Sequence, residues 1–118
     1  MNYIVQYTDW DDLINFPIMS QDGKSSCYAY IYKEDKTTMY LGNLYVSEDE
    51  RGKGRGKDIL NYVKTLAEKN GCNQLVLKVK VNDWVREWYE REGFTPYSID
   101  DEEPDIYAWY ETKIILTN

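Results

Sequence analysis

The sequence predicts an α/β (α+β) protein with a central mixed β-sheet flanked by helices, folded as one domain over residues 1–118. Two β-prone runs surround a polar turn in the first half of the chain. After Gly54 the apolar residues change to helical spacing, and a strand, a short helix and two more strands follow. A chain of 118 residues has room for a single hydrophobic core.

The N-terminal segment predicts a strand and a short helix. Residues 2–7, NYIVQY, form a short β-prone run. In the segment TDWDDLINF that follows, Thr8 or Asp9 is a suitable N-cap, and Pro17 would end the helix. We therefore expect about one short helix between the first strand and the rest of the sheet.

A β-hairpin is predicted next. The polar segment at 21–26 is typical of a turn, and the β-rich runs at 27–33 and 37–46 lie on either side of the polar tetrapeptide KEDK. Gly42 interrupts the second run. A glycine within a strand pattern indicates a bulge or the close approach of another molecule.

The middle of the chain predicts the main helix and the strand after it. Asn70 and Gly71 supply a C-terminal stop for a helix that starts near Gly54. Its apolar residues recur at helical spacing, namely Ile59, Leu60, Val63, Leu66 and Ala67. The strand at 74–81 has one apolar face, formed by Leu75, Leu77, Val79 and Val81.

A second helix and two closing strands complete the fold. The helix would be capped by Asn82 or Asp83 and end at Gly93. One side of it carries the apolar residues Trp84, Val85, Trp88 and Tyr89. The strands would cover 94–99 and 106–116, joined by the acidic loop DDEEPD at 100–105. The last strand is a candidate sheet edge, which is compatible with a homodimer.

The absence of histidine limits the chemistry available to this chain. It excludes Ser-His-Asp and Cys-His nucleophile pairs, and with only Cys27 and Cys72 it leaves no convincing zinc site, so we expect no metal. Two cysteines make no disulfide framework, and no apolar stretch that could be a signal peptide or membrane span follows Met1. We therefore expect a cytoplasmic protein with no membrane partner.

The net charge of −7 bears on the class of partner. Nucleic acid is disfavoured as a main partner, because phosphate backbones are bound by basic surfaces. Cationic partners are favoured instead. The alternative is that the charge serves only solubility.

Residues 49–60, DERGKGRGKDIL, gather positive charge within this acidic chain. Four basic residues alternate with three glycines where a strand gives way to a helix, a place where free backbone N–H groups and the helix dipole can receive an anion. The spacing fits neither a P-loop nor a Rossmann fingerprint. What remains is Arg-x-x-Gly-x-Gly at 51–56, which is either a phosphate-binding loop or a basic surface turn.

This pattern lies between LGNLYVSEDE and VNDWVREWYEREGF, and together these segments resemble the GNAT superfamily of N-acetyltransferases over about residues 40–97. The family's pyrophosphate loop has Arg or Gln-x-x-Gly-x-Gly or Ala at the start of its central helix. Its second signature is an Asn after the next strand, then a Tyr followed by Gly-Phe. The corresponding residues here are Asn82, Tyr89 and Gly93-Phe94.

The resemblance implies acetyl-CoA as co-substrate, with its pantetheine arm between two splayed parallel strands that end at Val46 and Val81. Three residues would line the thioester, Leu44, Tyr45 and Val46. The pyrophosphate would lie on the backbone of the glycine-rich loop, formed by Arg51, Gly52, Lys53, Gly54, Arg55, Gly56 and Lys57. Asn82 would either orient the arm or cap the helix.

The resemblance also implies Tyr89 as the general acid that protonates the departing thiolate. The alternative is a core aromatic on an amphipathic helix. The acceptor amine must lose a proton before it attacks, because an amine of pKa about 10.4 is protonated at neutral pH. Many family members have an acidic residue in the strand equivalent to 40–46, and this chain has none there. Glu48 or its acidic neighbours, or a water relay, would serve instead.

The expected reaction is direct attack of a primary amine in a ternary complex, because no covalent nucleophile is evident. The family has two helices ahead of the hairpin, whereas this chain has room for about one, so we expect an open acceptor site. An acidic loop near that site favours a cationic acceptor, either a protein lysine or a small amine. The alternatives are a catalytically inactive CoA-binding protein that acts through a partner, or a nucleic-acid module.

Overall fold

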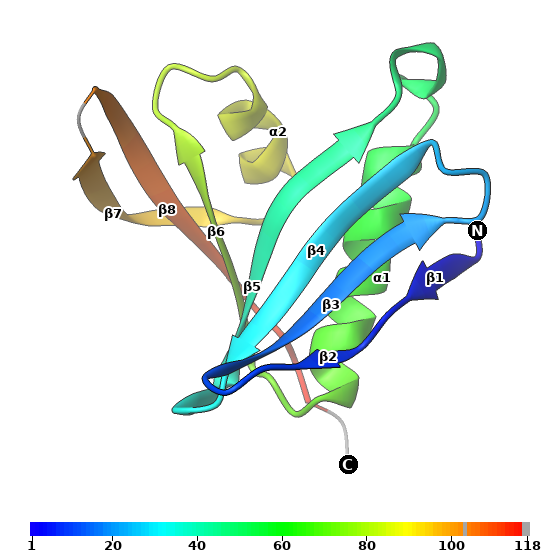
Figure 1. Cartoon of the computed structure of the whole chain (residues 1–118). Helices are drawn as coiled ribbons and strands as arrows, with labels where there is room; N and C mark the ends of the chain where they lie inside the picture. Colours follow the sequence, from blue (N-terminus) through cyan, green and yellow to red (C-terminus); the bar gives the residue numbers. More distant parts are fainter. Residues whose placement is uncertain (103, 117–118) are drawn as a thin grey trace.

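The computed structural model describes residues 1–102 and 104–116, and within them one mixed sheet of eight strands is accompanied by two α-helices (Figure 1). The strands of the first half are β1 (Tyr3–Val5), β2 (Thr8–Asp9), β3 (Leu13–Ser20), β4 (Ser25–Tyr32) and β5 (Asp35–Val46). A 3₁₀ turn at Glu48–Glu50 precedes α1 (Arg55–Lys69). The remaining elements are β6 (Gln74–Lys80), α2 (Val85–Arg91), β7 (Thr95–Glu102) and β8 (Asp105–Lys113).

The sheet confirms the predicted fold class of a mixed sheet with helices. Its strands are ordered β1-β3-β4-β5-β6-β8-β7, with β2 beside β3. All described neighbours are antiparallel except β5 and β6, which are joined through α1 and run parallel. A parallel pair requires such a crossover connection, because its strands enter the sheet from the same end.

Both helices pack on one face of the sheet. Alternate residues of β4 are buried in the core under α1, while the residues between them, Tyr28, Tyr30 and Tyr32, face the other way. From α2, Arg86 and Glu90 both contact the hydroxyl of Tyr110 on β8. The core between helices and sheet includes Leu60, Met39, Leu75 and Tyr110, all almost completely buried. In the described residues, no helix covers the opposite face of the β3–β4–β5 part of the sheet (Figure 1).

The helix predicted in residues 8–16 is wrong, because this segment forms β2 and the start of β3. The segment is a strand because its apolar residues alternate with polar or more exposed ones. Ile14, Phe16 and Ile18 lie on one side of β3 and pair with inward-facing residues of β4. Pro17 lies within β3, opposite Tyr28. Its carbonyl accepts a hydrogen bond from the N–H of Gln6, in the gap between β1 and β2, so its missing N–H faces a break in the outer pairing.

Two further expectations near the C-terminus are wrong. The acidic segment 100–105 is not a free loop, because β7 extends to Glu102 and β8 begins at Asp105. The strand at 106–116 is not a sheet edge, since β8 lies between β6 and β7. The edge on this side is β7, because the β7–β8 hairpin folds back to place its second strand in the sheet.

The remaining predicted elements are confirmed. The hairpin of β4 and β5, the helix after Gly54, the strand at 74–81 and the short helix before Gly93 are all present, with boundaries within a few residues. In the described part of the chain, neither helix is long and apolar enough to cross a membrane.

Candidate active site

A cleft opens where the two parallel strands separate. β5 and β6 are paired only over Thr38–Tyr40 and Gln74–Val76, and beyond these residues each strand continues without the other. The space between them is a cleft of about 950 Å³, lined by residues 41–46 of β5 and 77–80 of β6. Separation of adjacent strands leaves backbone N–H and C=O groups unpaired, so the cleft can bind a polar chain along its wall.

The N-terminus of α1 forms the floor of one end of this cleft. Gly54 is the N-cap residue and has the left-handed φ of 81°, and the first intrahelical bond joins the N–H of Asp58 to its carbonyl. The N–H groups of the first turn therefore have no intrahelical acceptor. Together with the helix dipole they form a site suited to an anion such as a pyrophosphate.

Gly56 lies at the contact between α1 and α2. A Cβ placed there would be 3.4 Å from Cζ2 of Trp88 and 4.0 Å from Cγ2 of Val46. These are ordinary van der Waals distances, so a methyl group fits, whereas a larger side chain would press on Trp88 or fill the cleft. Trp88 thus covers the helix start from the side of α2 and narrows the cleft at this point.

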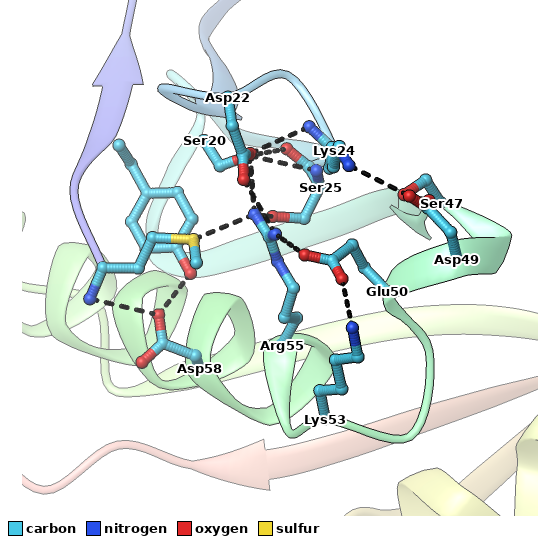
Figure 2. Close-up of polar contacts among 12 residues, drawn as sticks. Ser20, Asp22, Lys24, Ser25, Ser47, Asp49, Glu50, Lys53, Arg55 and Asp58 are labelled. Carbon is cyan, nitrogen blue, oxygen red and sulfur yellow. Dashed lines mark hydrogen bonds and ion pairs between the residues drawn. The ribbon is translucent and has the colours of Figure 1, made fainter.

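The guanidinium group of Arg55 points away from the mouth of the loop and into a polar cluster (Figure 2). Its side chain is 7% exposed and donates to Asp22 in the β3–β4 turn, Nη1 to Oδ2 at 2.8 Å and Nη2 to Oδ1 at 2.7 Å. Nη1 also donates to Oε1 of Glu50 at 3.0 Å. Hydrogen bonds from Arg55 lower the pKa of Asp22 far below its ordinary value.

This cluster changes the charge available to a phosphate. Lys53 is paired with Oε2 of Glu50 at 2.7 Å, so Glu50 neutralises part of the charge of Lys53 and Arg55 (Figure 2). Arg51 and Lys57 line the cleft and are exposed. The Nε of Arg51 donates to the carbonyl of Val46 at 3.0 Å and ties the loop to the end of β5. Of the four basic residues in this loop, these two have their charge at the cleft.

Tyr89 lines the cleft from α2 although its side chain is only 6% exposed. Its ring packs against Trp88 and Phe94. Burial first, then the nearby Cys27 and Asp83, raises the pKa of Tyr89 above its ordinary value. The phenol is therefore a neutral hydrogen-bond donor at physiological pH.

The interruption at Gly42 has two structural causes. The β4–β5 register skips next to it, and Asn43 has the left-handed φ of 52°, which marks the expected bulge. The close neighbour is Tyr28, because a Cβ at Gly42 would be 2.5 Å from Cζ of that ring. The bulge redirects β5 into the wall of the cleft.

The structure brings most of the predicted site residues to the cleft. Its lining includes Leu44, Tyr45, Val46, Arg51, Gly52, Gly54, Arg55, Gly56, Lys57 and Tyr89. Three predicted residues are not part of this lining. Lys53 is turned to Glu50, Glu48 is exposed on the 3₁₀ turn, and Asn82 is exposed in the turn after β6. The N-cap residue of α2 is Trp84, and Asp83 just before it accepts a hydrogen bond from the N–H of Val85 at its Oδ1.

Sequence reasoning missed several residues of the site. Leu77, Lys78 and Lys80 line the cleft from β6, and Trp88 from α2. For Trp88, the signal in the sequence is its position next to Tyr89 in the same short predicted helix. Asp22 gave no signal, because it lies 33 positions from Arg55 in the chain. Across the described ranges 1–102 and 104–116, no group of three or more Cys, Asp or Glu is arranged to hold a metal ion.

Comparison with known proteins assigns this architecture to a family. The family model described as "Acetyltransferase (GNAT) domain" matches residues 14–96, and the chain belongs to this family. GNAT acetyltransferases transfer the acetyl group of acetyl-CoA to an amine. Among curated protein sequences, none matches the chain.

Solved structures share the fold at low sequence identity. The ribosomal-protein-S18-alanine N-acetyltransferase from Escherichia coli superimposes with a TM-score of 0.72 at 18% identity, covering 93% of this chain and 74% of that one. Nourseothricin acetyltransferase superimposes with a TM-score of 0.72 at 16% identity, covering 96% of this chain and 85% of that one. An acetyltransferase from Bacillus cereus superimposes with a TM-score of 0.67 at 18% identity, covering 86% of this chain and 73% of that one. At such identities the likeness concerns the fold alone.

Proposed function

We propose that this chain is an acetyl-CoA-dependent N-acetyltransferase that acts on a primary amine of a cationic acceptor, a protein lysine above all, by direct attack in a ternary complex. One observation carries the proposal: the cleft between separated β5 and β6 ends at the glycine-rich start of α1. That combination provides unpaired strand backbone beside an anion site, which is what a long polar arm ending in a pyrophosphate requires.

The residues of the cleft fit acetyl-CoA. Gly54 and Gly56 leave space at the helix start, and Arg51 and Lys57 add positive charge there. The separated end of β5, residues 44–46, offers backbone groups to the pantetheine arm. Acetyl-CoA supplies the acetyl group as a thioester, which an amine attacks at the carbonyl carbon.

We assign Tyr89 to the leaving group. Its buried phenol would donate a hydrogen bond to the sulfur as negative charge develops there. A raised pKa favours stabilisation by a shared proton over complete transfer, because the thiol is the stronger acid, with a reference pKa of about 8.5. The surrounding rings of Trp88 and Phe94 limit water around this donor.

We assign deprotonation of the acceptor amine to water held by a carboxylate of the cleft. Glu50 is committed to Lys53 and Arg55, and Glu48 lies outside the lining. Asp83 and Glu92 are the other carboxylates that line the cleft. An exposed cleft with water-bound carboxylates can accept the proton without a buried base.

The test has two stages. Calorimetric titration of the purified chain with acetyl-CoA should give micromolar or tighter binding at one site. Mass spectrometry of lysine-rich peptides incubated with the chain and acetyl-CoA should then show an added acetyl group, absent when either component is omitted. Binding of acetyl-CoA without transfer to any amine would contradict the proposed enzyme activity and favour a CoA-binding protein. Absence of binding would contradict both the enzyme activity and the CoA-binding alternative.

A further inference from the structure

The sheet face that faces away from both helices carries a continuous aromatic surface, here called the tyrosine face and formed by Tyr28, Tyr30, Tyr32 and Tyr40. Tyr30 stacks on Tyr40 with centroids 5.1 Å apart and on Tyr28 at 5.9 Å. Tyr32 meets both Tyr30 and Tyr40 edge to face, at 5.5 and 5.3 Å. All four rings are partly exposed, and contiguous exposed aromatic surface of this kind marks an interaction site.

Trp10 turns part of this face into a groove. It lies in the loop between β2 and β3, is 52% exposed, and borders a recess of about 410 Å³ over Leu13, Asn15 and the tyrosines of β4. Burial raises the pKa of Tyr30 to about 12, so its phenol stays neutral. The floor of the groove is therefore uncharged, with hydroxyl groups among aromatic rings.

The rim of the groove is acidic. Residues 9–12 and 33–36, in the two turns at its end, contain five carboxylates and two lysines, and one of these lysines, Lys33, is paired with Asp9. Aromatic rings bordered by carboxylates attract cations. The same sheet face already holds an ammonium group in this way, since Nζ of Lys78 lies 4.8 Å from the ring centroid of Tyr107 and 5.6 Å from that of Trp109.

The groove and the cleft meet at one contact. Tyr28 lines the groove, Gly42 lines the cleft, and the Tyr28 ring lies directly against Gly42. From Tyr32 to Tyr28 the groove follows five residues of β4, about 13 Å of extended strand from the first Cα to the last. A small amine is usually bound in an enclosed pocket, whereas an open track of this length suits an extended chain.

We infer that this groove binds the acceptor as an extended cationic polypeptide segment, laid along the tyrosines of β4, with its target lysine passing Tyr28 to reach the cleft. The inference rests on the proposed acetyltransferase function. Stacking of two copies of the chain through this face would bring two acidic rims together, each in a chain of net charge −7. The same rim repels a nucleic-acid backbone.

Fluorescence anisotropy tests the groove without depending on turnover. The probe is a fluorescein-labelled octapeptide with three lysines separated by glycine and alanine, and the protein is first saturated with CoA, which carries no acetyl group. Trp10→Ala should weaken binding about tenfold, as expected for loss of an aromatic–cation contact. Trp10→Phe should restore most of it. Asp11→Asn with Asp12→Asn should weaken binding and reduce its salt dependence.

Matched controls separate the groove from general effects. Tyr62→Ala removes a partly buried aromatic of α1 that packs on Tyr3 at the helix-covered side, and it should leave peptide affinity unchanged. A peptide with glutamate in place of lysine should not bind. Thermal melts establish that each variant is folded. Equal affinity of wild type and Trp10→Ala, or binding of the glutamate peptide, would overturn the inference.

Transfer measurements separate this inference from the proposed function. If Trp10→Ala acetylates the lysine peptide with an unchanged KM for the peptide, the groove is not the acceptor site, and the acetyltransferase function is still supported. Binding that depends on Trp10 without transfer to any amine would support the groove and overturn the acetyltransferase. Dimerisation that is lost in Trp10→Ala would overturn the inference in favour of a second copy of the chain.

Discussion

The guanidinium group of Arg55 and the carboxylate of Asp22 form a two-point contact, with N–O distances of 2.7 and 2.8 Å, across 33 positions of the chain. It joins the first turn of α1 to the β3–β4 turn, and Ser20 and Glu50 complete the cluster (Figure 2). A planar guanidinium favours this parallel geometry. The contact fixes the direction of the glycine-rich loop although neither side chain faces the cleft mouth.

Loss of the Asp22 carboxylate should therefore loosen the loop. Asp22→Asn leaves the mostly buried Arg55 with one carboxylate partner, so we expect a lower melting temperature and weaker acetyl-CoA binding. Asp49→Asn is the matched control, because it removes a carboxylate from the exposed pair with Lys24 and should change neither. Melting curves and calorimetry measure both effects. Equal behaviour of the two variants would show that the cluster does not position the loop.

The same pair gives a pH dependence with a defined sign. Because Arg55 lowers the pKa of Asp22 in the folded state, the stabilising contribution is complete above the unfolded pKa of about 3.9 and is lost as pH falls below it. The difference in melting temperature between wild type and Asp22→Asn should be constant from pH 5 to 7 and should shrink below about pH 4. A difference that grows on acidification would contradict the assignment.

Two of the three glycines of the loop, Gly54 and Gly56, should respond differently to substitution. Gly54→Ala keeps open space around its Cβ but puts alanine at φ 81°, which costs about 1–2 kcal/mol of stability. Gly56→Ala should be tolerated, whereas the side chain of Gly56→Leu must displace Trp88 or fill the cleft, and either change should greatly reduce acetyl-CoA affinity in a folded protein. Calorimetry with parallel melting curves distinguishes the two. Normal affinity in Gly56→Leu would remove the helix start from the site.

Tyr89→Phe should separate turnover from binding. The substitution keeps the ring and its packing on Trp88 and Phe94, so it should leave the fold and the acetyl-CoA affinity nearly unchanged. If the phenol donates to the leaving sulfur, kcat should fall about 100-fold. Tyr45→Phe, which removes a hydroxyl from an exposed ring of the same cleft, is the control. An unchanged kcat would end the assignment of Tyr89.

The effect of substituting Gly42 on stability should depend on the side chain of Tyr28. Gly42→Ala places Cβ 2.5 Å from Cζ of Tyr28 and forces the ring off its stack with Tyr30, a change that typically costs about 1–3 kcal/mol. In a Tyr28→Ala background the same substitution should have almost no effect on the free energy of unfolding. Denaturant unfolding of the four proteins in this double-mutant cycle measures the coupling. Additive effects would show that the ring and the glycine are independent.

Local patterns were sufficient for most elements of the fold and for the glycine-rich loop of the cleft lining. The helical spacing from Ile59 to Ala67 predicts α1, and the glycine loop predicts the anion site at its start. Residues 8–16 by themselves predict a helix, because Thr8 or Asp9 and Pro17 are suitable helix ends when considered alone. Pairing of β3 with β4 overrides those signals, since a strand is stabilised by its neighbours.

The sequence by itself determined most elements of the fold and the place of the glycine-rich loop, because each depends on residues close in the chain. Tyr89 was indicated only through the resemblance to a family, because its nearness to the loop is a contact between distant segments. Only the tertiary structure decided where the loop's charges go. Arg55 and Lys53 are turned to carboxylates, and Arg51 and Lys57 are left at the cleft. It also decided that four tyrosines share one open face. Contacts between distant segments set both outcomes, because a side chain's partners depend on how the whole chain packs.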